Sequence, residues 1–173
     1  MRANADVNRG PSAEAREAVT ALYEAHALGM IRLGVVMLGD RAAAEDVVQE
    51  AFCGLYRHWH SLSDPGKALS YVRSSVINGS RSALRRRVRQ PVGFAGDRPG
   101  ESAESLALVG EEHRQVLAAI RRLPDRQREA LVLRYDLDLS EEDIARTMRI
   151  SRGTVKSTIS RALSALGRIL GEQ

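Results

Sequence analysis

The chain has few of the residues that build covalent links and catalytic sites. Its 173 residues include one cysteine, Cys53, so no internal disulfide can form. It contains no glycine-rich phosphate loop and no serine-elbow motif, and nothing near Cys53 marks the thiol as an activated nucleophile. We therefore expect no enzymatic activity.

Long apolar runs are also absent from the sequence. No segment resembles a signal peptide or a membrane span, which predicts a cytoplasmic protein without membrane insertion. His58 and His60 follow Cys53 closely, but on a helix the two imidazoles point to different sides. Only the distant His26 and His113 remain to complete four zinc ligands. The sequence therefore predicts neither a metal nor another cofactor.

Hydrophobic and basic residues are what the chain does have. It is 43% hydrophobic and 28% charged, with a formal net charge of +4 and a pI near 9.7. This composition supports folded cores, and it suggests a polyanionic partner where the basic residues cluster. Lys67 and Lys156 are the only lysines. The arginine excess suits contacts to phosphate and guanine, and a GC-rich genome would explain it equally well.

Residues 140–162 predict two short helices joined by a tight turn. Ser140 is a good N-cap with Asp143 reaching back to it, and Ser151 is a second N-cap after the turn at Arg149 and Ile150. The first helix has an apolar face of Ile144, Ala145 and Met148. In the second helix the predicted apolar stripe consists of Val155, Ile159, Ala162, Leu163, Leu166 and Leu170.

The outer face of this second helix carries polar and cationic groups. These are Arg152, Lys156, Ser157, Ser160 and Arg161. A DNA-recognition helix needs this division, because one side packs on its own domain while the other offers donors to phosphates and base edges. Charges alone would fit an ordinary solvated helix equally well. The combination of cap, turn and apolar stripe favours recognition of DNA.

The pattern of the whole chain predicts an all-α protein with two small domains. We expect a disordered tail over residues 1–12, a first domain over 13–88, a linker over 89–110 and a second domain over 111–173. The first domain contains clear signals for helix ends. Gly39 is expected to end one helix and Asp40 to cap the next, and Asp64 followed by Pro65 is expected to begin a third.

The densest basic cluster lies on the expected third helix. Asn78, Arg81 and Arg85 share one face at helical spacing with Ser74, and further arginines extend the charge beyond it. Such a strip neutralises several phosphates, which gives a steep salt dependence of binding. A basic helix end that complements its own dipole is the simpler alternative, but it needs only one or two cations.

The sequence resembles a known family, the sigma-70 factors, and within it the small extracytoplasmic-function (ECF, group IV) sigma factors. The similarity to region 4 of that family rests on Leu123-Pro124, Arg128, Leu133-Arg134, Leu139-Ser140, Ile144-Ala145, Ile150-Ser151 and Gly153 to Ser157. Arg149 departs from the pattern, because the family usually has glycine in the turn. If the turn requires a positive φ, a side chain there carries a modest backbone cost.

The resemblance implies two DNA-binding surfaces. The second domain would read the duplex minus-35 element through Arg152, Thr154, Lys156, Ser157, Ser160 and Arg161. The third helix resembles region 2.4, with Tyr71 and Asn78 at their usual places and Ser82 in place of a customary aspartate. It implies capture of a flipped non-template base and minus-10 contacts by Leu62, Ser63, Asp64, Asn78, Arg81, Arg85 and Arg86.

A third implied surface binds protein. The run from Glu45 to Phe52 resembles region 2.2, which grips the coiled coil of the polymerase β′ subunit, and this assigns the contact to Asp46, Gln49, Glu50 and Phe52. Without the resemblance, these acidic and polar groups would be taken as a solvated helix face. The implied partners are the β′ and β subunits of core RNA polymerase and promoter DNA, with an anti-sigma factor as a candidate regulator.

The sequence thus predicts a dissociable initiation factor that binds core RNA polymerase, recognises the minus-35 and minus-10 elements, and promotes melting. The chief alternative is a conventional helix-turn-helix regulator with a helical partner-sensing domain. The arginine-rich third helix and the acidic second helix count against it. A helical adaptor that binds only protein is a further alternative, and it would leave both basic surfaces unused.

Overall fold

The computed structural model describes residues 13–89 and 111–171, which contain helices and no strands. The expected tail over 1–12 and nearly all of the expected linker over 89–110 lie outside these residues. The N-terminal part holds α1 (Ala13–Leu38), α2 (Arg41–His58), the 3-10 turns η1 (Trp59–Ser61) and η2 (Pro65–Lys67), and α3 (Ala68–Arg89). The C-terminal part holds α5 (Glu111–Arg121), α6 (Asp125–Leu131), the π-helical turn η3 (Val132–Asp136), α7 (Glu141–Met148) and α8 (Arg152–Gly171).

Local chemistry sets the ends of the first helices. Gly39 adopts φ 69°, and its N–H donates to the Val35 carbonyl at 2.8 Å, which closes α1. The Asp40 carboxylate then accepts from the Ala43 N–H at 3.0 Å and starts α2. Asp64 caps η2 in the same way, with Pro65 at its first position. These predicted helix ends are confirmed.

The helix-turn-helix geometry depends on a left-handed residue. Ser140 Oγ accepts from the Asp143 N–H at 3.1 Å to begin α7, and it also donates to the Asp143 carboxylate at 2.6 Å. This hydrogen bond is the main reason that the pKa of Asp143 lies below its usual range. The helix ends at Arg149, whose φ of 55° is the positive value that the turn requires. The departure from glycine at this position therefore places an arginine in a strained conformation.

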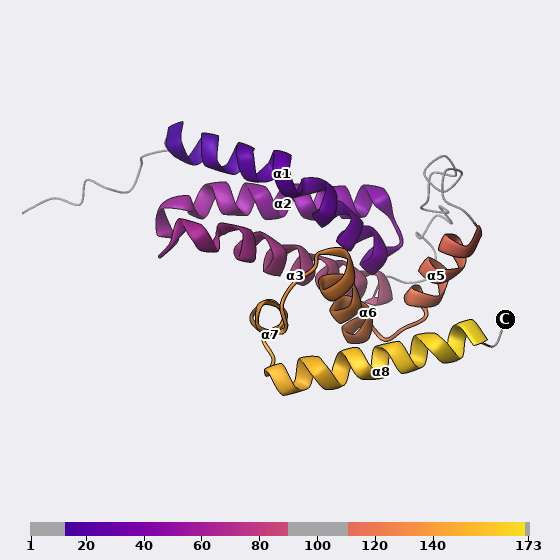
Figure 1. Cartoon of the computed structure of the whole chain (residues 1–173). Helices are drawn as coiled ribbons and strands as arrows, with labels where there is room; N and C mark the ends of the chain where they lie inside the picture. Colours follow the sequence, from indigo (N-terminus) through magenta and orange to yellow (C-terminus); the bar gives the residue numbers. More distant parts are fainter. Residues whose placement is uncertain (1–12, 90–110, 172–173) are drawn as a thin grey trace, which may run out of the picture.

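α1, α2 and α3 lie side by side, and α8 runs along the opposite edge of the molecule (Figure 1). The α1 helix has the length and apolar character of a membrane span, yet it contacts both α2 and α3, and Met30, Leu33 and Met37 on it are buried. It therefore contributes one side to a folded core.

The two parts of the chain pack against each other. One continuous cluster of buried side chains includes Leu33 and Ile77 from the N-terminal part together with Leu133 and Ile144 from the C-terminal part. α1 contacts α5, α6 and η3, and α3 contacts α7. The sequence predicts two domains but not this shared apolar contact between them.

Not every residue assigned to an apolar stripe is buried. Leu163 was expected on the buried side of α8, but it is 45% exposed, and Thr158 is buried on that side. Tyr23 on α1 is likewise 45% exposed. Helical spacing identifies the angular position of a side chain, whereas its burial depends on where the neighbouring helices end.

Candidate functional site

The outward face of α8 carries every residue predicted to contact the minus-35 element. Ser151 caps this helix by accepting from the Thr154 N–H at 3.1 Å, and Val155, Thr158 and Ala162 anchor its inner side. The six predicted side chains are all exposed: Arg152, Thr154, Lys156, Ser157, Ser160 and Arg161. The helix therefore presents donors along one free side, as recognition of a groove requires.

The cationic side chains on this face make only weak, solvent-exposed contacts within the protein. Arg152 and Lys156 lie 4.0 and 3.7 Å from the same carboxylate oxygen of Glu141, and both side chains are about two-thirds exposed. Arg161 donates from Nε to the Ser157 carbonyl at 3.0 Å. Exposed ion pairs of this kind contribute little stability, so phosphate can replace Glu141 at small cost.

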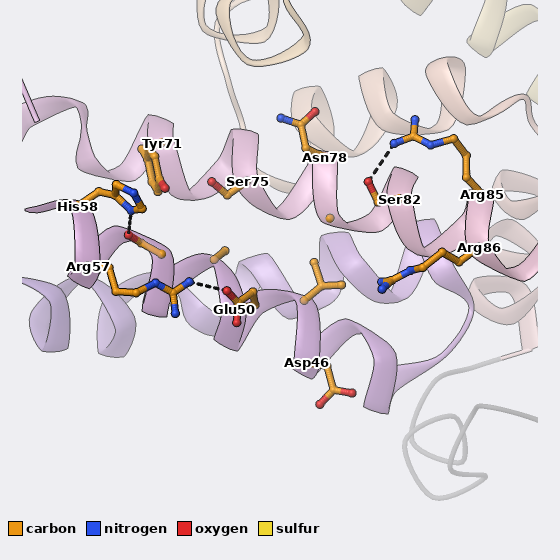
Figure 2. Close-up of a pocket in the computed structure, with 14 residues that line it drawn as sticks. Asp46, Glu50, Arg57, His58, Tyr71, Ser75, Asn78, Ser82, Arg85 and Arg86 are labelled. Carbon is orange, nitrogen blue, oxygen red and sulfur yellow. Dashed lines mark hydrogen bonds and ion pairs between the residues drawn. The ribbon is translucent and has the colours of Figure 1, made fainter. Parts of the chain in front are cut away.

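A groove between α2 and α3 forms the second candidate surface (Figure 2). Its volume is about 690 Å³, and the α2 side contributes the carboxylates of Asp46 and Glu50. The α3 side contributes Asn78, Arg85 and Arg86, so three of the predicted minus-10 residues lie beside two of the predicted polymerase contacts. The two carboxylates therefore lie on the α2 wall of the groove, and Arg85 and Arg86 lie on the α3 wall.

Internal contacts hold part of this groove in place. Arg57 Nη2 lies 2.5 Å from a Glu50 oxygen, a pairing that raises the pKa of the guanidinium. His58 Nδ1 lies 2.8 Å from the Gly54 carbonyl oxygen, and Arg85 donates to Ser82 Oγ at 2.9 Å. Asp46 and Asn78 line the groove with exposed side chains that extend outward from its two walls (Figure 2). The rims of the groove are thus accessible to a partner or to DNA.

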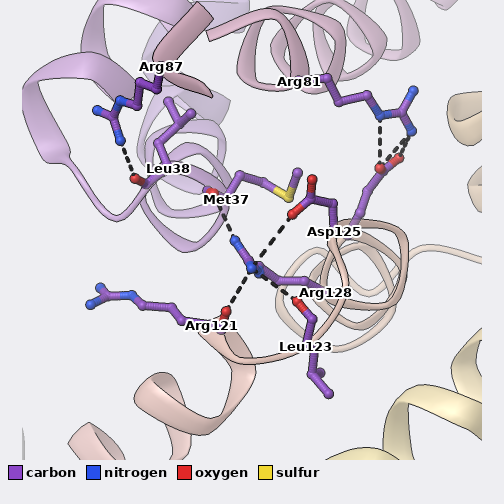
Figure 3. Close-up of polar contacts among 9 residues, drawn as sticks. Met37, Leu38, Arg81, Arg87, Arg121, Leu123, Asp125 and Arg128 are labelled. Atoms are coloured by element: carbon purple, nitrogen blue, oxygen red, sulfur yellow. Dashed lines mark hydrogen bonds and ion pairs between the residues drawn. The ribbon is translucent and has the colours of Figure 1, made fainter. Parts of the chain in front are cut away.

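The remaining predicted minus-10 residues lie elsewhere. Leu62, Ser63 and Asp64 form the loop before η2 and do not line the groove, and the Asp64 carboxylate accepts from the Gly66 N–H at 2.8 Å. Arg81 is on α3, but its guanidinium points to the C-terminal part and pairs with Glu129 (Figure 3). The structure therefore brings together only part of the predicted minus-10 set.

A second, more apolar groove of about 420 Å³ lies between α1 and α2, and it includes the other two predicted polymerase contacts. Gln49 is exposed there, whereas Phe52 is only 4% exposed and packs edge-on against the Tyr23 ring with centroids 5.0 Å apart. The sequence analysis did not assign Tyr23 or Tyr56, which also line this groove, to the polymerase surface. The four-residue spacing of Phe52 and Tyr56 along α2 was the available signal.

Polar contacts join the two parts of the chain (Figure 3). Arg81 Nη2 lies 2.6 Å from each Glu129 oxygen, and its Nε lies 3.1 Å from Oε2. Arg128 donates to the Met37 carbonyl at 2.9 Å and also to the Arg121 and Leu123 carbonyls at 2.7 and 3.0 Å. These bonds connect α6 to both α1 and α3.

Glu129 is an ionisable residue whose side chain lies in the interior of the protein. Its side chain has no exposed surface, and this burial raises the pKa of the carboxyl even though Arg81 acts in the opposite direction. The sequence contained a weak signal for it, because Glu129 lies four residues before the buried Leu133 on the same helical side. Across the part of the chain that the structure describes, no three His, Cys, Asp or Glu side chains are grouped so as to hold a metal ion.

Comparison with known proteins matches both parts of the chain. Residues 22–90 match the family model for sigma-70 region 2, and residues 113–166 match the model for sigma-70, region 4. The RNA polymerase sigma-H factor of Pseudomonas aeruginosa is 34% identical over 161 residues, which cover 86% of this chain and 82% of that protein. The ECF RNA polymerase sigma factor SigL of Mycobacterium tuberculosis is 30% identical, with 94% of each chain covered.

Two solved structures share the fold. CnrH, solved with the cytosolic domain of CnrY, is similar with a TM-score of 0.70 at 20% identity, covering 92% of this chain and 96% of that chain. The sigma factor RpoE, solved with the anti-sigma factor NepR from Bartonella quintana, has a TM-score of 0.64 at 20% identity, covering 91% and 94%. Each similarity extends over both helical parts.

Proposed function

Because this chain belongs to the sigma-70 family and is an ECF RNA polymerase sigma factor, we propose that its three candidate surfaces divide the work of initiation. It binds core RNA polymerase, recognises the minus-35 and minus-10 elements, and promotes promoter melting. The observation that carries this conclusion is the match to both region 2 and region 4 on one chain. A conventional regulator with a partner-sensing domain would not contain region 2.

The minus-35 surface is the outer face of α8, from Arg152 to Arg161. Its exposed cations would bind phosphates, and the shorter Thr154, Ser157 and Ser160 side chains would reach base edges in the major groove. Support comes from the exposure of all six side chains and from the weak engagement of Arg152 and Lys156 by Glu141.

The minus-10 surface consists of the exposed residues of α3 and the loop Leu62–Asp64. Asn78, Arg85 and Arg86 line the α2/α3 groove and would hold the non-template strand. Extrusion of a base costs a few kcal/mol, which stacking and pocket contacts can offset without any catalytic residue. For this reason we propose that the protein is not an enzyme.

The polymerase surface centres on α2. Asp46 and Glu50 line the α2/α3 groove, while Gln49 and Phe52 line the α1/α2 groove. A helical partner such as the β′ coiled coil would therefore contact α2 on both sides. The aromatic side chains of Tyr23 and Tyr56 extend this surface toward α1. Apolar area flanked by exposed carboxylates suits a partner helix that carries arginines.

The domain boundaries and the setting of the protein follow from the same proposal. Residues 13–88 would form the region 2 domain and residues 111–173 the region 4 domain, with 89–110 as linker and 1–12 as a tail. A factor that serves core polymerase would act in the cytoplasm. The two similar structures were solved with CnrY and with the anti-sigma factor NepR, which makes an anti-sigma factor a candidate partner of this chain as well.

Reconstituted transcription tests the proposal. The purified chain is added to sigma-free core polymerase with fragmented genomic DNA of the source organism, and the start sites are mapped. Initiation from defined sites, absent with core alone, is the expected result. Failure to bind core, together with specific binding to duplex DNA alone, would instead identify a conventional regulator.

A further inference from the structure

The three acidic residues in the first turn of α7 differ in their partners. They are Glu141, Glu142 and Asp143. The carboxylates of Glu142 and Asp143 both pair with Arg146 of the same helix. Glu141 instead extends to α8, where its Oε2 lies 4.0 Å from Arg152 Nη2 and 3.7 Å from Lys156 Nζ. Of these three carboxylates, Glu141 is therefore the one that contacts the two cations at the start of the minus-35 surface.

The geometry of this contact leaves both cations accessible. Arg152 and Lys156 are four residues apart, so they project from the same side of α8. Both distances to Glu141 exceed those of hydrogen bonds, so the contact is an electrostatic attraction without fixed geometry. Among the residues that the structure describes, Glu141 is the one carboxylate within 4.0 Å of either cation. A phosphate that approaches this side of α8 would therefore compete with Glu141 for both of them.

The charge on this side of α8 is lower than its cations suggest. Together with Glu141, Arg152 and Lys156 carry one net positive charge rather than two. Resting on the minus-35 surface proposed above, we propose that Glu141 limits the affinity of that surface for DNA. Its carboxylate takes the position of a phosphate beside the two cations, and it weakens every complex that α8 forms with a duplex.

This role bears on how the protein distinguishes promoters from other DNA. Contacts to phosphate are the same on every sequence and supply nearly all of non-specific binding. Sequence is read by groups that reach base edges. Because Glu141 opposes the phosphate contacts, it lowers the affinity of the chain for unrelated DNA. A stable complex then requires base contacts as well, which only a matching promoter offers.

A simpler explanation of Glu141 has to be separated from this one. A carboxylate in the first turn of a helix stabilises the helix through its dipole. The same benefit applies to Glu142, which lies in the same turn but pairs with Arg146 of α7. Glu142→Gln is therefore the matched control for Glu141→Gln. Both variants remove one negative charge from the first turn of α7, and the difference between them isolates the contact with α8.

The first test measures duplex binding by the full chain without polymerase. Fluorescence anisotropy gives the affinity for a mixed-sequence duplex of about 25 base pairs over a series of salt concentrations, and circular dichroism checks the fold. At low salt, Glu141→Gln should bind at least about threefold more tightly than Glu142→Gln, because both cations are released to phosphate. Its slope of log affinity against log salt should be steeper by up to about 0.9. A helix-dipole role alone would not change that slope.

Two results of this test would overturn the proposal. Equal affinity and slope in Glu141→Gln and Glu142→Gln would show that the contact with α8 does not limit binding. A lower affinity in a folded Glu141→Gln protein would show that Glu141 orients Arg152 and Lys156 for DNA instead of competing with it.

A second test removes the two cations. In a background of Arg152→Ala and Lys156→Ala, Glu141→Gln should lose most of its gain in affinity, since no cation remains to be released. A gain of the same size in that background would refute the proposal. The background also tests the minus-35 surface by itself. If it binds duplex DNA as tightly as the wild type, that surface is wrong, whereas a weaker background with equal Glu141→Gln and Glu142→Gln proteins rejects only the role of Glu141.

Discussion

Gly34 on α1 lies so close to Ala44 on α2 that a Cβ added at residue 34 would stand 2.8 Å from the Ala44 Cβ and 3.2 Å from its Cα. Since the obstruction includes backbone, a rotamer change cannot relieve it. Gly34→Ala should therefore push the two helices apart and lower the free energy of unfolding by about 1–3 kcal/mol. Urea denaturation monitored by circular dichroism measures the change.

Gly167 provides the matched control for that prediction. It lies inside α8 with nothing within 4 Å of its added Cβ, so Gly167→Ala should raise stability by roughly 0.5–1 kcal/mol through helix propensity alone. If both alanine variants changed stability in the same direction, close packing at Gly34 would not be the cause.

Arg149 occupies the left-handed position that ends α7, with φ 55°. Glycine adopts this conformation without strain, so Arg149→Gly should stabilise the protein by about 0.5–1 kcal/mol, even though glycine loses more entropy on folding. Thermal denaturation gives the shift in melting temperature. Arg146→Gly, an exposed position within α7, should have the opposite effect, and loss of stability in both would contradict the assignment of strain to Arg149.

The burial of Glu129 has a consequence for the pH dependence of stability. Because burial raises the pKa of its carboxyl above the usual 4.5, the folded chain holds that proton more tightly than the unfolded chain does. Its contribution to stability is full below about pH 4.5 and is lost as the pH rises through the folded-state pKa. The stability of the wild type minus that of Glu129→Gln should therefore decline as the pH rises above about 4.5. Urea titrations at several pH values test this. Glu142→Gln is the reference, because it removes the same charge from an exposed carboxylate of α7. A rising difference would show that Arg81 outweighs burial.

Glu50 tests the polymerase surface. Its carboxylate is 72% exposed and pairs with Arg57, so Glu50→Arg reverses the charge offered to a partner and sets two cations side by side. We expect the affinity for core polymerase to fall by roughly tenfold or more, while the affinity for duplex DNA stays unchanged. Competition with the wild type for core measures the first quantity, and anisotropy measures the second. Equal damage to both in a folded variant would reject the assignment.

Arg161 tests the minus-35 surface. It is exposed on α8 and bonded only to Ser157 of its own helix among the contacts seen. Arg161→Ala should weaken promoter binding and, if the guanidinium binds a phosphate, reduce the slope of log affinity against log salt by about 1. Core binding should not change. A large loss of affinity with an unaltered salt slope would point to a base contact instead.

Much of the local structure could be predicted from the sequence, because caps and turns act over a few residues. Gly39, Asp40, Ser140 and Ser151 each mark a helix end through hydrogen bonds within four positions. The positive φ at Arg149 could be predicted in the same way, since the turn chemistry is local.

The relation between the two parts could not be predicted. Apolar periodicity shows that Leu33 and Leu133 are buried, but it does not show that they belong to one cluster. Glu129 and Arg81 gave no sequence signal of their pairing, because a long-range ion pair leaves no periodic pattern. The predicted minus-10 set therefore included an arginine that this fold turns toward the C-terminal part of the chain.

Arg128 shows how such a junction can persist while sequences diverge. Among the residues that the structure describes, its guanidinium donates to main-chain oxygens of residues 37, 121 and 123 and makes a loose contact with Asp125 at 3.7 Å. Main-chain oxygens are the same whatever side chain a residue carries. A substitution at any of those three positions therefore leaves the acceptor oxygen in place as long as the backbone keeps its path, whereas a lysine at position 128 could not supply the fork of donors that reaches them. The Arg128 contact between the two parts therefore depends on one side chain and on the backbone of its acceptors.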